Sequence, residues 1–503
     1  MRASLLLALI LAFTFRALYT VYTGNPYYVD SWPLIAGAKT FSSSPEARVF
    51  DDSYYDGYNN RWPYSIVTAG VLSLVTGANP VDVGRLLGPS LGALAVLALY
   101  TLASRISDGR RAGLVAVIAA CSGTLFAFEG GFTKEVYARP LVLLATLAVL
   151  YAWRLPAVVA LILAVAFTHH VSTVALAGVL SGILATSYLY EFSRGYTVTP
   201  TRRLALALAL TLAFQAFQAY LAAPGFWRSS ITVGKAASLS LFVTTSLSIA
   251  AFALFPSQRV TFKHRAVFAS VIGFSAAAMS FIAMASPPTP QTTPLGAYMT
   301  LYAAPLVLSP LFAYTARASK EQAVVVGGWL VGLGGLMAYS AFSGDLVAAA
   351  AIQRFINYTL YGVLLAYATG PPKLVIAQTV IALAAAPVIA VNILEARDPY
   401  YHYNLYTHSE IALAELLLPR ASAVYGDSKV SYLAYMYKVK VENPPPALDK
   451  LDKPLIVHWE NAAKGFWVGG LIYGDVGEIA LASLKHNLSY NDGVNKIIAG
   501  TGS

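Results

Sequence analysis

The chain has 503 residues, of which 57% are hydrophobic and only 12% are charged, and its net charge is +10. This composition is typical of a protein that crosses a membrane many times, and it excludes an ordinary soluble enzyme. The basic excess does not indicate a nucleic-acid partner, because most of it falls in short loops between apolar segments, as the positive-inside rule requires. The single cysteine, Cys121, provides no disulfide framework and no thiolate metal site.

The N-terminal segment has the charge and apolar core of a signal peptide, but no small-residue cleavage site follows, so we expect a retained first helix. A helix that spans the membrane needs about 20 mostly apolar residues. By this criterion we expect thirteen spans, of which the fifth and the twelfth are short: 3–22, 84–103, 112–128, 137–153, 155–168, 171–190, 204–223, 237–255, 266–285, 297–316, 322–341, 355–369 and 374–393.

The apolar stretch 64–78 is too short for a span, and we expect a helix that lies against the membrane within a first external loop, 23–83. This choice places basic clusters such as Arg105, Arg110 and Arg111 on the cytoplasmic side. We therefore expect a multi-pass protein of the cell membrane with a cytoplasmic N-terminus.

The composition changes at residue 395, where the transmembrane domain (1–394) is expected to end. Residues 395–503 contain no span, two short β-type runs (SAVYG and PLIVHWE) and one helical pattern (SEIALAELLLP). They are long enough for one small α/β domain, which the topology places outside the cell. Asn487 begins a glycosylation-type sequon on the same side.

Most acidic residues before residue 395 fall on the outer side in this topology, and Asp30 lies just beyond the first span, beside Tyr28 and Trp32. A carboxylate at the membrane surface could act as a general base towards an acceptor hydroxyl, or hold a divalent cation. Asp30 also precedes a segment that begins Ser-Trp-Pro, which suits a helix N-cap. Taken alone, the residues favour the cap.

A second external loop, 129–136, carries Glu129, two glycines and Glu135. The glycines allow a tight backbone, and Glu135 is placed to open the next helix, where the helix dipole favours an acid. Glu135 could therefore belong to a functional site, or it could only stabilise the start of this helix through the helix dipole.

His169 and His170 interrupt an apolar stretch at an outer turn, where ionisable residues mark a base, a metal ligand or a phosphate donor. On one helix, adjacent side chains point about 100° apart, so at most one histidine is expected to reach a site. The alternative is a histidine paired to a neighbouring backbone group.

Arg354 opens the twelfth span on the outer side, with few acids nearby in sequence. Its planar guanidinium suits the phosphate of a lipid carrier, although an interfacial anchor that snorkels to lipid headgroups explains it equally well. Arg228 and Lys235 are secondary candidates on the same grounds.

Residues 10–155 resemble the N-terminal part of the GT-C superfamily of membrane glycosyltransferases, nearest to the catalytic subunits of archaeal and bacterial oligosaccharyltransferases. Asp30-Ser-Trp32 stands where that family has an Asp-Pro-Trp-like element with a catalytic, metal-binding Asp. The loop helix, Pro89 before an apolar span, Ala112-Gly-Leu114 after a basic inner turn, and the second acidic loop follow in the same order.

The chain departs from the oligosaccharyltransferases at three places. Thr133 stands where a second loop acid is expected, the Trp-Trp-Asp-Tyr-Gly signature that reads the acceptor sequon is missing from 395–503, and the late loop SPPTPQTTP has no acid. These departures weaken metal binding and sequon recognition, and they leave sugar transfer from a lipid carrier as the expectation.

The resemblance implies an enzyme that moves a sugar from a polyprenyl-phosphate or -diphosphate donor to a protein, glycan or lipid acceptor at the outer face of the membrane. Asp30 would activate the acceptor, with Glu135 or Glu129 positioning it or a cation (Mg²⁺ or Mn²⁺ held by Asp30 and Glu135). The other residues of the implied site bind donor or line the cavity: Arg354, His169, His170, Trp32 and Arg228. Alternatives are an oligosaccharyltransferase, a transporter or flippase of a lipid-linked substrate, and a non-catalytic GT-C relative.

Overall fold

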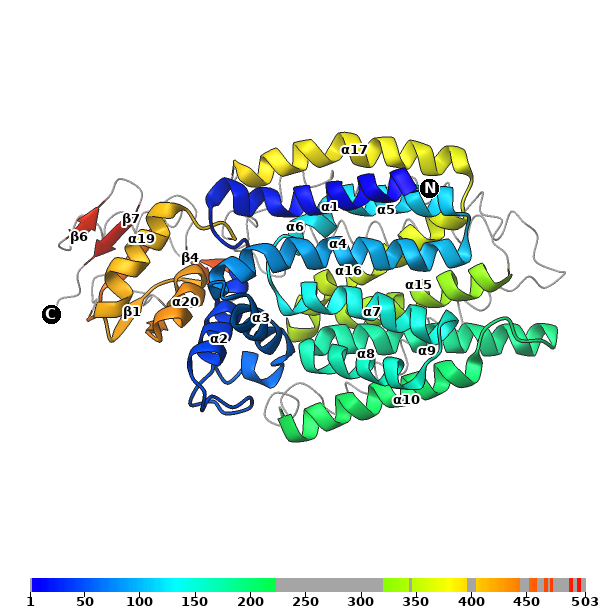
Figure 1. The fold of residues 1–503 in the computed structure, drawn as a ribbon, viewed down its shortest axis with the longest axis horizontal. Coiled ribbons are helices and arrows are strands. Elements are labelled where there is room, and N and C mark those ends of the chain that lie inside the picture. Colours follow the sequence, from blue (N-terminus) through cyan, green and yellow to red (C-terminus); the bar gives the residue numbers. More distant parts are fainter. Residues whose placement is uncertain are drawn as a thin grey trace.

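The computed structural model describes residues 2–222, 320–342, 346–395, 404–443 and 452–458, and four short strands at 466–468, 471–473, 488–491 and 495–498. Long helices lie side by side along the horizontal axis of Figure 1. They are α1 (Arg2–Thr23), α4 (Pro80–Ile106), α5 (Gly109–Cys121), α7 (Lys134–Tyr151), α8 (Leu155–Thr168), α9 (His170–Arg194), α10 (Thr201–Phe217, continued by η2, Gln218–Ala222), α15 (Lys320–Phe342), α16 (Leu346–Thr369) and α17 (Pro372–Leu394).

Six of the described helices, α1, α4, α9, α10, α15 and α17, are long and apolar enough to cross a membrane. The pair α5 and α6 (Gly123–Glu129), bent by 60°, makes a seventh if it counts as one span. The expected spans 237–255, 266–285 and 297–316 lie outside the described residues, so the count of thirteen is not shown. The protein is therefore a multi-pass helical membrane protein with at least six candidate spans.

Two expected spans differ from the structure in their bounds. The segment 112–128 is a broken helix because Ser122 adopts an extended conformation between α5 and α6 and its hydroxyl bonds back to the Ile118 carbonyl at 2.7 Å. The segment 355–369 is not short, because α16 starts at Leu346, where an Ala-rich run has high helix propensity.

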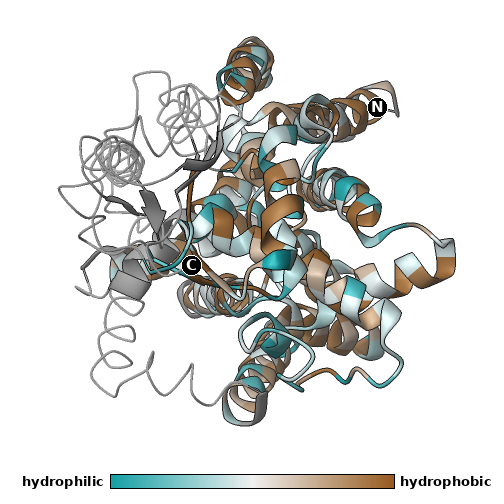
Figure 2. Cartoon of the chain, turned by 90° about the vertical axis from the view of Figure 1, so that its left-hand side faces the viewer, coloured by the Kyte–Doolittle hydropathy of each residue, from teal (hydrophilic) through white to brown (hydrophobic). Residues whose placement is uncertain are grey.

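The outer surface of the bundle is apolar, as a lipid-facing surface must be. Figure 2, turned so that one end of the bundle faces the viewer, shows hydrophobic residues in brown along the helices. Large side chains on α1 and α17 are exposed, among them Ile10 (54%), Val21 (78%) and Val380 (59%). Such exposure would be costly in water and is expected against lipid.

The first external loop forms α2 (Ser31–Ser43), the short turn η1 (Asn59–Arg61) and α3 (Tyr64–Thr76). These helices lie at the end of the bundle opposite the N-terminus (Figure 1). The predicted loop helix at 64–78 is confirmed as a 13-residue helix that packs on α2, with Ile66 under Gly37 and Phe41 under Gly70. Its other face exposes Leu74 and Val75.

The C-terminal segment contains a five-stranded sheet in the order β2-β1-β3-β7-β6 and a two-stranded sheet, β4-β5. In the larger sheet β1 pairs with β2 and β3 in parallel, and β7 pairs with β3 and β6 antiparallel. The elements are α19 (His408–Leu417), η4 (Leu418–Arg420), β1 (Ala423–Tyr425), α20 (Ser428–Ala434), η5 (Tyr435–Tyr437), β2 (Lys440–Glu442), β3 (Leu455–His458), β4 (Phe466–Val468), β5 (Leu471–Tyr473), β6 (Leu488–Asn491) and β7 (Asn495–Ile498).

The predicted helix and both predicted strands of this small α/β segment are confirmed. A capping box explains where α19 begins, since the Thr407 hydroxyl accepts from the Glu410 amide while the Glu410 carboxylate accepts from the Thr407 amide. Of the sequon, Asn487 lies outside the described residues, and Leu488 starts β6.

The C-terminal segment is joined to the first external loop by direct contacts. The Tyr28 amide donates to the Asn404 carbonyl at 3.1 Å, and the Trp32 ring meets the Tyr406 ring edge-on at 5.5 Å. In Figure 1 α19, α20 and β1 lie at the same end of the bundle as α2 and α3. This packing lets the C-terminal segment reach the acidic loop.

Candidate active site

The two acidic loops meet backbone to backbone at Gly131. A Cβ atom at this position would lie 2.5 Å from the Tyr28 Cβ and 2.6 Å from the Tyr27 carbonyl oxygen. On the other side, a Cβ at Gly88 of α4 would lie 2.7 Å from the Gly131 carbonyl carbon. The glycine pair 130–131 therefore permits a close approach of the two loops, which brings the Asp30 segment beside the start of α7.

Asp30 is the N-cap residue of α2, but its side chain makes no capping hydrogen bond, and its backbone is helical at φ −63° and ψ −10°. The carboxylate instead accepts a hydrogen bond from the Tyr432 hydroxyl of α20 and faces the Arg354 and Lys134 cations. Burial raises the pKa of Asp30, and the two cations and the Tyr432 hydrogen bond oppose that rise. The capping interpretation is therefore wrong in its chemistry, although the position in the helix is correct.

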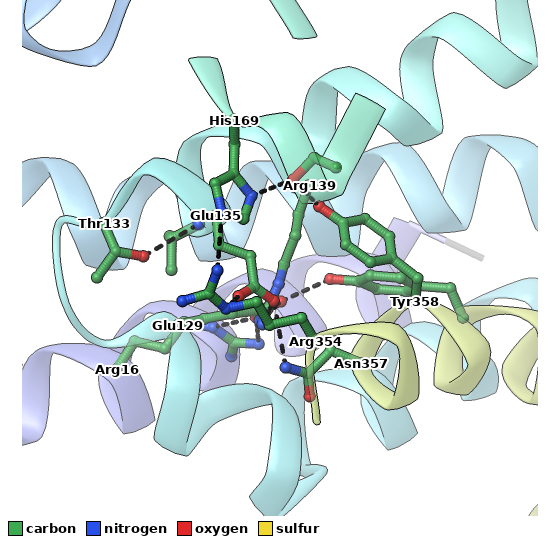
Figure 3. Close-up of polar contacts among 12 residues, drawn as sticks. Arg16, Glu129, Thr133, Glu135, Arg139, His169, Arg354, Asn357 and Tyr358 are labelled. Carbon is green, nitrogen blue, oxygen red and sulfur yellow. Dashed lines mark hydrogen bonds and ion pairs between the residues drawn. The ribbon is translucent and has the colours of Figure 1, made fainter. Parts of the chain in front are cut away.

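Glu135 sits between two guanidinium groups in the first turn of α7 (Figure 3). Its carboxylate pairs with Arg139 at 2.6 Å and with Arg354 Nε at 3.8 Å, and it accepts from the Asn357 amide at 3.3 Å. Arg139 is 1% exposed, so this pairing takes place away from water. Glu135 is thus held by side chains of α7 and α16, in addition to any help from the helix dipole.

Glu129, at the end of α6, is fully buried and has all its oxygens engaged. Arg16 of α1 donates from Nε at 2.8 Å and from Nη2, Arg139 pairs at 3.0 Å, and the Tyr361 hydroxyl donates at 2.5 Å. Figure 3 labels Arg16, Glu129 and Arg139 in this cluster. Glu129 therefore holds Arg139 in place, and Arg139 in turn pairs with Glu135, which pairs with Arg354. Glu129 thus affects Arg354 only through these two residues.

His169 and His170 are not on one helix, as the sequence-based argument assumed, because His169 is extended (φ −159°) at the break between α8 and α9. His169 Nδ1 lies 2.7 Å from the Ser172 hydroxyl, which also accepts from the Tyr358 hydroxyl, and its Nε2 lies 3.5 Å from Arg354 Nη1. His170 turns instead to the Trp62 ring, at 4.7 Å between centroids. The prediction that one histidine reaches the site matches this placement of His169 beside Arg354.

Lys134 lies over the ring of Tyr58, with Nζ 3.8 Å from the ring centroid, and within 5.1 Å of the Trp62 centroid. The side chain is buried, and Nζ makes no hydrogen bond to any residue that the structure describes. Thr133 before it is the N-cap of α7 and accepts from the Val136 amide at 3.2 Å. Thr133, which stands where a second acid was expected, thus caps α7, and the cationic Lys134 follows it.

Four further residues of the charged cluster did not emerge from the sequence: Arg16, Lys134, Arg139 and Tyr432. Arg16 had a usable signal, since a charged residue inside an apolar span is a functional or structural site by default. Arg139 also had one, because it follows Glu135 by four residues on one helix face. Tyr432 had none, since its contact with Asp30 joins segments about four hundred residues apart.

The remaining predicted site residues lie elsewhere. Trp32 is 4% exposed and packs with Tyr406 between the loop and the C-terminal segment. Arg228 and Lys235 lie outside the described residues. Asp30, Glu135, His169 and Arg354 thus form one group with Lys134, and Trp32 supports the loop that carries Asp30.

The predicted cation ligands, Asp30 and Glu135, both face cations of this chain. Glu135 is already neutralised by Arg139 and Arg354, and Asp30 faces Arg354 and Lys134. Among the residues that the structure describes, no three His, Cys, Asp or Glu side chains come together as a metal site would require.

No family model and no curated protein matches this sequence. The structure, however, matches the crystal structure of the oligosaccharyltransferase of Archaeoglobus fulgidus in the apo form, with a TM-score of 0.52 and 13% identity over 99% of this chain and 74% of that one. The chain has the GT-C fold.

A second structure agrees with this assignment: the archaeal oligosaccharyltransferase AglB from Archaeoglobus fulgidus in complex with an inhibitory peptide and a dolichol-phosphate. It matches with a TM-score of 0.51 and 12% identity, again over 99% of this chain and 74% of that one. The match to ArnT from Cupriavidus metallidurans in the apo state is weaker, with a TM-score of 0.40, 11% identity, and coverage of 99% and 97%. The resemblance predicted from residues 10–155 is confirmed, at the level of the fold.

Proposed function

We propose that the protein is a membrane glycosyltransferase that moves a sugar from a polyprenyl-phosphate-linked donor to an acceptor. The observation that carries this proposal is the arrangement of Asp30 beside Arg354 and Lys134, at the end of the bundle where the first external loop and the C-terminal segment meet. A base beside fixed cations is what transfer away from a phosphate leaving group requires.

The chemical step follows from this geometry. Asp30 accepts the proton of the acceptor nucleophile, whose electron pair forms a bond to the anomeric carbon of the sugar. The bond from that carbon to the carrier phosphate breaks, and the phosphate oxygen keeps the electron pair. Positive charge that is already in place at Arg354 stabilises the departing anion without reorganisation.

The residues behind Arg354 set its position. Glu135 pairs with its Nε, and His169 lies against its Nη1. Arg139 and Asn357 hold Glu135 from the other side, so the guanidinium is aimed by a network rather than by its own long side chain. Such an arranged donor loses less entropy on binding phosphate than a free arginine would.

The membrane orientation belongs to the same proposal. The N-terminus and the turn between α4 and α5, with Arg105, Arg110 and Arg111, lie at the end of the bundle away from the acidic loop (Figure 1). The positive-inside rule then places this end in the cytoplasm and Asp30 at the outer face of the cell membrane. The donor would reach Asp30 from the lipid phase.

An oligosaccharyltransferase is the second candidate, because its fold is matched over nearly the whole chain and one matched AglB structure holds a peptide and a dolichol-phosphate. Incubation with a sequon peptide, compared with a glycan or lipid acceptor, distinguishes the two candidates.

The test uses purified protein in lipid vesicles with a donor whose sugar is radiolabelled. We expect the label to leave the polyprenyl lipid and enter an acceptor extracted from the host membrane. If the intact lipid crosses between leaflets with its sugar attached, the protein is a flippase. If the lipid binds and the sugar never leaves under any acceptor condition, the protein is a non-catalytic relative.

A further inference from the structure

An open cavity of about 330 Å³ lies between the first external loop and the C-terminal segment. One wall is a face of α2, a second comes from the loop before η1, and a third comes from η5 and the start of β2. Its volume is within the range of sites that bind small molecules. We call it the α2 cavity, and no residue of the charged cluster around Arg354 lines it.

The α2 wall of the cavity leads to Asp30. The residues of α2 that line the cavity are Pro33, Ala36, Gly37 and Thr40. They are spaced three and four residues apart, so they lie on one face of the helix and extend for about 10 Å along it. Asp30 precedes Pro33 by three residues and has helical backbone angles, so it continues the same face.

The opposite wall also leads to Asp30. Tyr432 of α20 donates a hydrogen bond to the Asp30 carboxylate, and Tyr435, one turn later in η5, lines the cavity. Both α20 and η5 contact α2. Asp56, on the remaining wall, interacts electrostatically with Tyr435 and with Lys134 beside Asp30. The two helical walls of the α2 cavity thus meet at Asp30.

The lining of the cavity combines aromatic rings with groups that form hydrogen bonds. The faces of sugar rings carry C–H groups that pack on aromatic faces, and sugar hydroxyls both donate and accept hydrogen bonds. The lining therefore has the chemistry that a saccharide needs. The residues that provide it include Tyr54, Tyr55, Tyr435, Thr40, Asp56 and Lys438.

The hydroxyl of Tyr55 is a second, independent sign of a ligand. The side chain is 8% exposed, and its hydroxyl has no hydrogen-bond partner among the residues that the structure describes. Native proteins seldom leave a buried hydroxyl without a partner. A hydroxyl of a ligand in the cavity would supply the missing hydrogen bond.

The charges of the lining do not select an ion. Lys440, at the rim, already pairs with Glu442 at 2.8 Å. The two other charged lining residues, Lys438 and Asp56, have opposite signs. A peptide also fits less well, because the helical walls use their backbone amides and carbonyls internally and offer few partners to an extended chain.

We propose that the α2 cavity binds a neutral saccharide, and that this saccharide is the acceptor, with a hydroxyl at one end placed beside Asp30. Its identity as the acceptor rests on the proposed function, whereas the binding of a saccharide does not. Tyr435 packs on a sugar ring, and Tyr55 forms a hydrogen bond with a sugar hydroxyl.

The first test measures binding without a donor. Wild-type protein in nanodiscs free of glycolipid and of sugar detergent is applied to an array of neutral oligosaccharides, including those released from host glycolipids. For the saccharide that binds best, Tyr435→Leu should bind about 5-fold or more weakly. Tyr55→Phe, which removes only the hydroxyl, should bind about 2- to 10-fold more weakly.

The matched control is Tyr22→Leu, which removes an exposed tyrosine of α1 that does not line the cavity and should bind as the wild type does. Tyr435 is 40% exposed, so Tyr435→Leu should fold. If it does not, Tyr55→Phe, which keeps the ring, carries the test. No binding to any saccharide on the array, or equal affinities for the Tyr22 and cavity variants, overturns the proposal.

The second test uses the vesicle transfer assay with the same saccharide as acceptor. Tyr435→Leu should raise the KM for the acceptor and leave kcat nearly unchanged, because the cavity holds the acceptor and Asp30 takes its proton. Transfer to a sequon peptide but not to the saccharide overturns the acceptor role. Saccharide binding that depends on Tyr435 and Tyr55, with no transfer to any acceptor, supports the saccharide site and contradicts the proposed enzyme activity instead.

Discussion

Substitution of Gly92 tests the buried pair that supports the site. A Cβ at this position on α4 would lie closer than 3.0 Å to both Cδ and Nε of Arg16 and 3.4 Å from the Glu129 Cβ. Arg16 is fully buried and also donates to the Ala12 carbonyl at 3.1 Å, so it has nowhere to swing.

Gly92→Ala can relax in two ways. If Arg16 leaves Glu129, a buried charge loses a partner at a cost of about 3–5 kcal/mol. If α4 shifts instead, overpacking costs about 1–3 kcal/mol. The cheaper response sets the observed loss, so we expect Gly92→Ala to destabilise the protein by about 1–3 kcal/mol.

The assay is thermal unfolding in detergent, with Gly334→Ala as the control. Gly334 is a helical glycine of α15 whose Cβ would meet nothing within 4 Å, so it reports the helix-propensity gain alone. Adding Arg16→Met to Gly92→Ala should reduce the loss caused by the alanine, because the overlapping atoms are replaced by a slimmer side chain. Equal midpoints for Gly92→Ala and Gly334→Ala would refute the packing described for Arg16.

Two further predictions concern the site itself. Arg354→Gln should weaken dolichyl phosphate binding in nanodiscs by roughly 10-fold or more. The control, Arg85→Gln, removes an arginine from an exposed pair with Asp82 and should leave binding unchanged. Equal losses of affinity in the two variants would show that Arg354 is only a lipid anchor. Tyr432→Phe removes a hydrogen bond that lowers the pKa of Asp30, so that pKa should rise and the acidic limb of the transfer rate should move to higher pH, with little change at alkaline pH. An unchanged limb would remove Asp30 as the titrating base.

The sequence predicted the parts of the site that have local signals. Asp30 follows a span, Glu135 opens a helix, and the histidines interrupt an apolar run, so each stood out from its neighbours. The glycine pair 130–131 indicated a tight backbone, and in the structure the two loops pack against each other at Gly131. These features could be predicted because they depend only on residue type and on spacing along the sequence.

The pairings could not be predicted, because they join distant segments. Arg16 meets Glu129 across more than a hundred residues, and Tyr432 reaches Asp30 only because the C-terminal segment docks on the first external loop. The expected span bounds, 168 and 171, did indicate the break at His169, and only the assumption that both histidines lie on one helix failed. Tertiary packing decides such contacts, and hydrophobic periodicity does not report it.

Asp30→Asn tests the central claim most directly, with the exposed Asp82→Asn as its control. The substitution should fold well, since burial already raises the pKa of Asp30 and so favours an uncharged side chain there. In vesicles with a radiolabelled polyprenyl-phosphate sugar, we predict that Asp30→Asn transfers no label and still binds dolichyl phosphate. A folded Asp30→Asn protein that transfers sugar at the rate of Asp82→Asn would contradict the account.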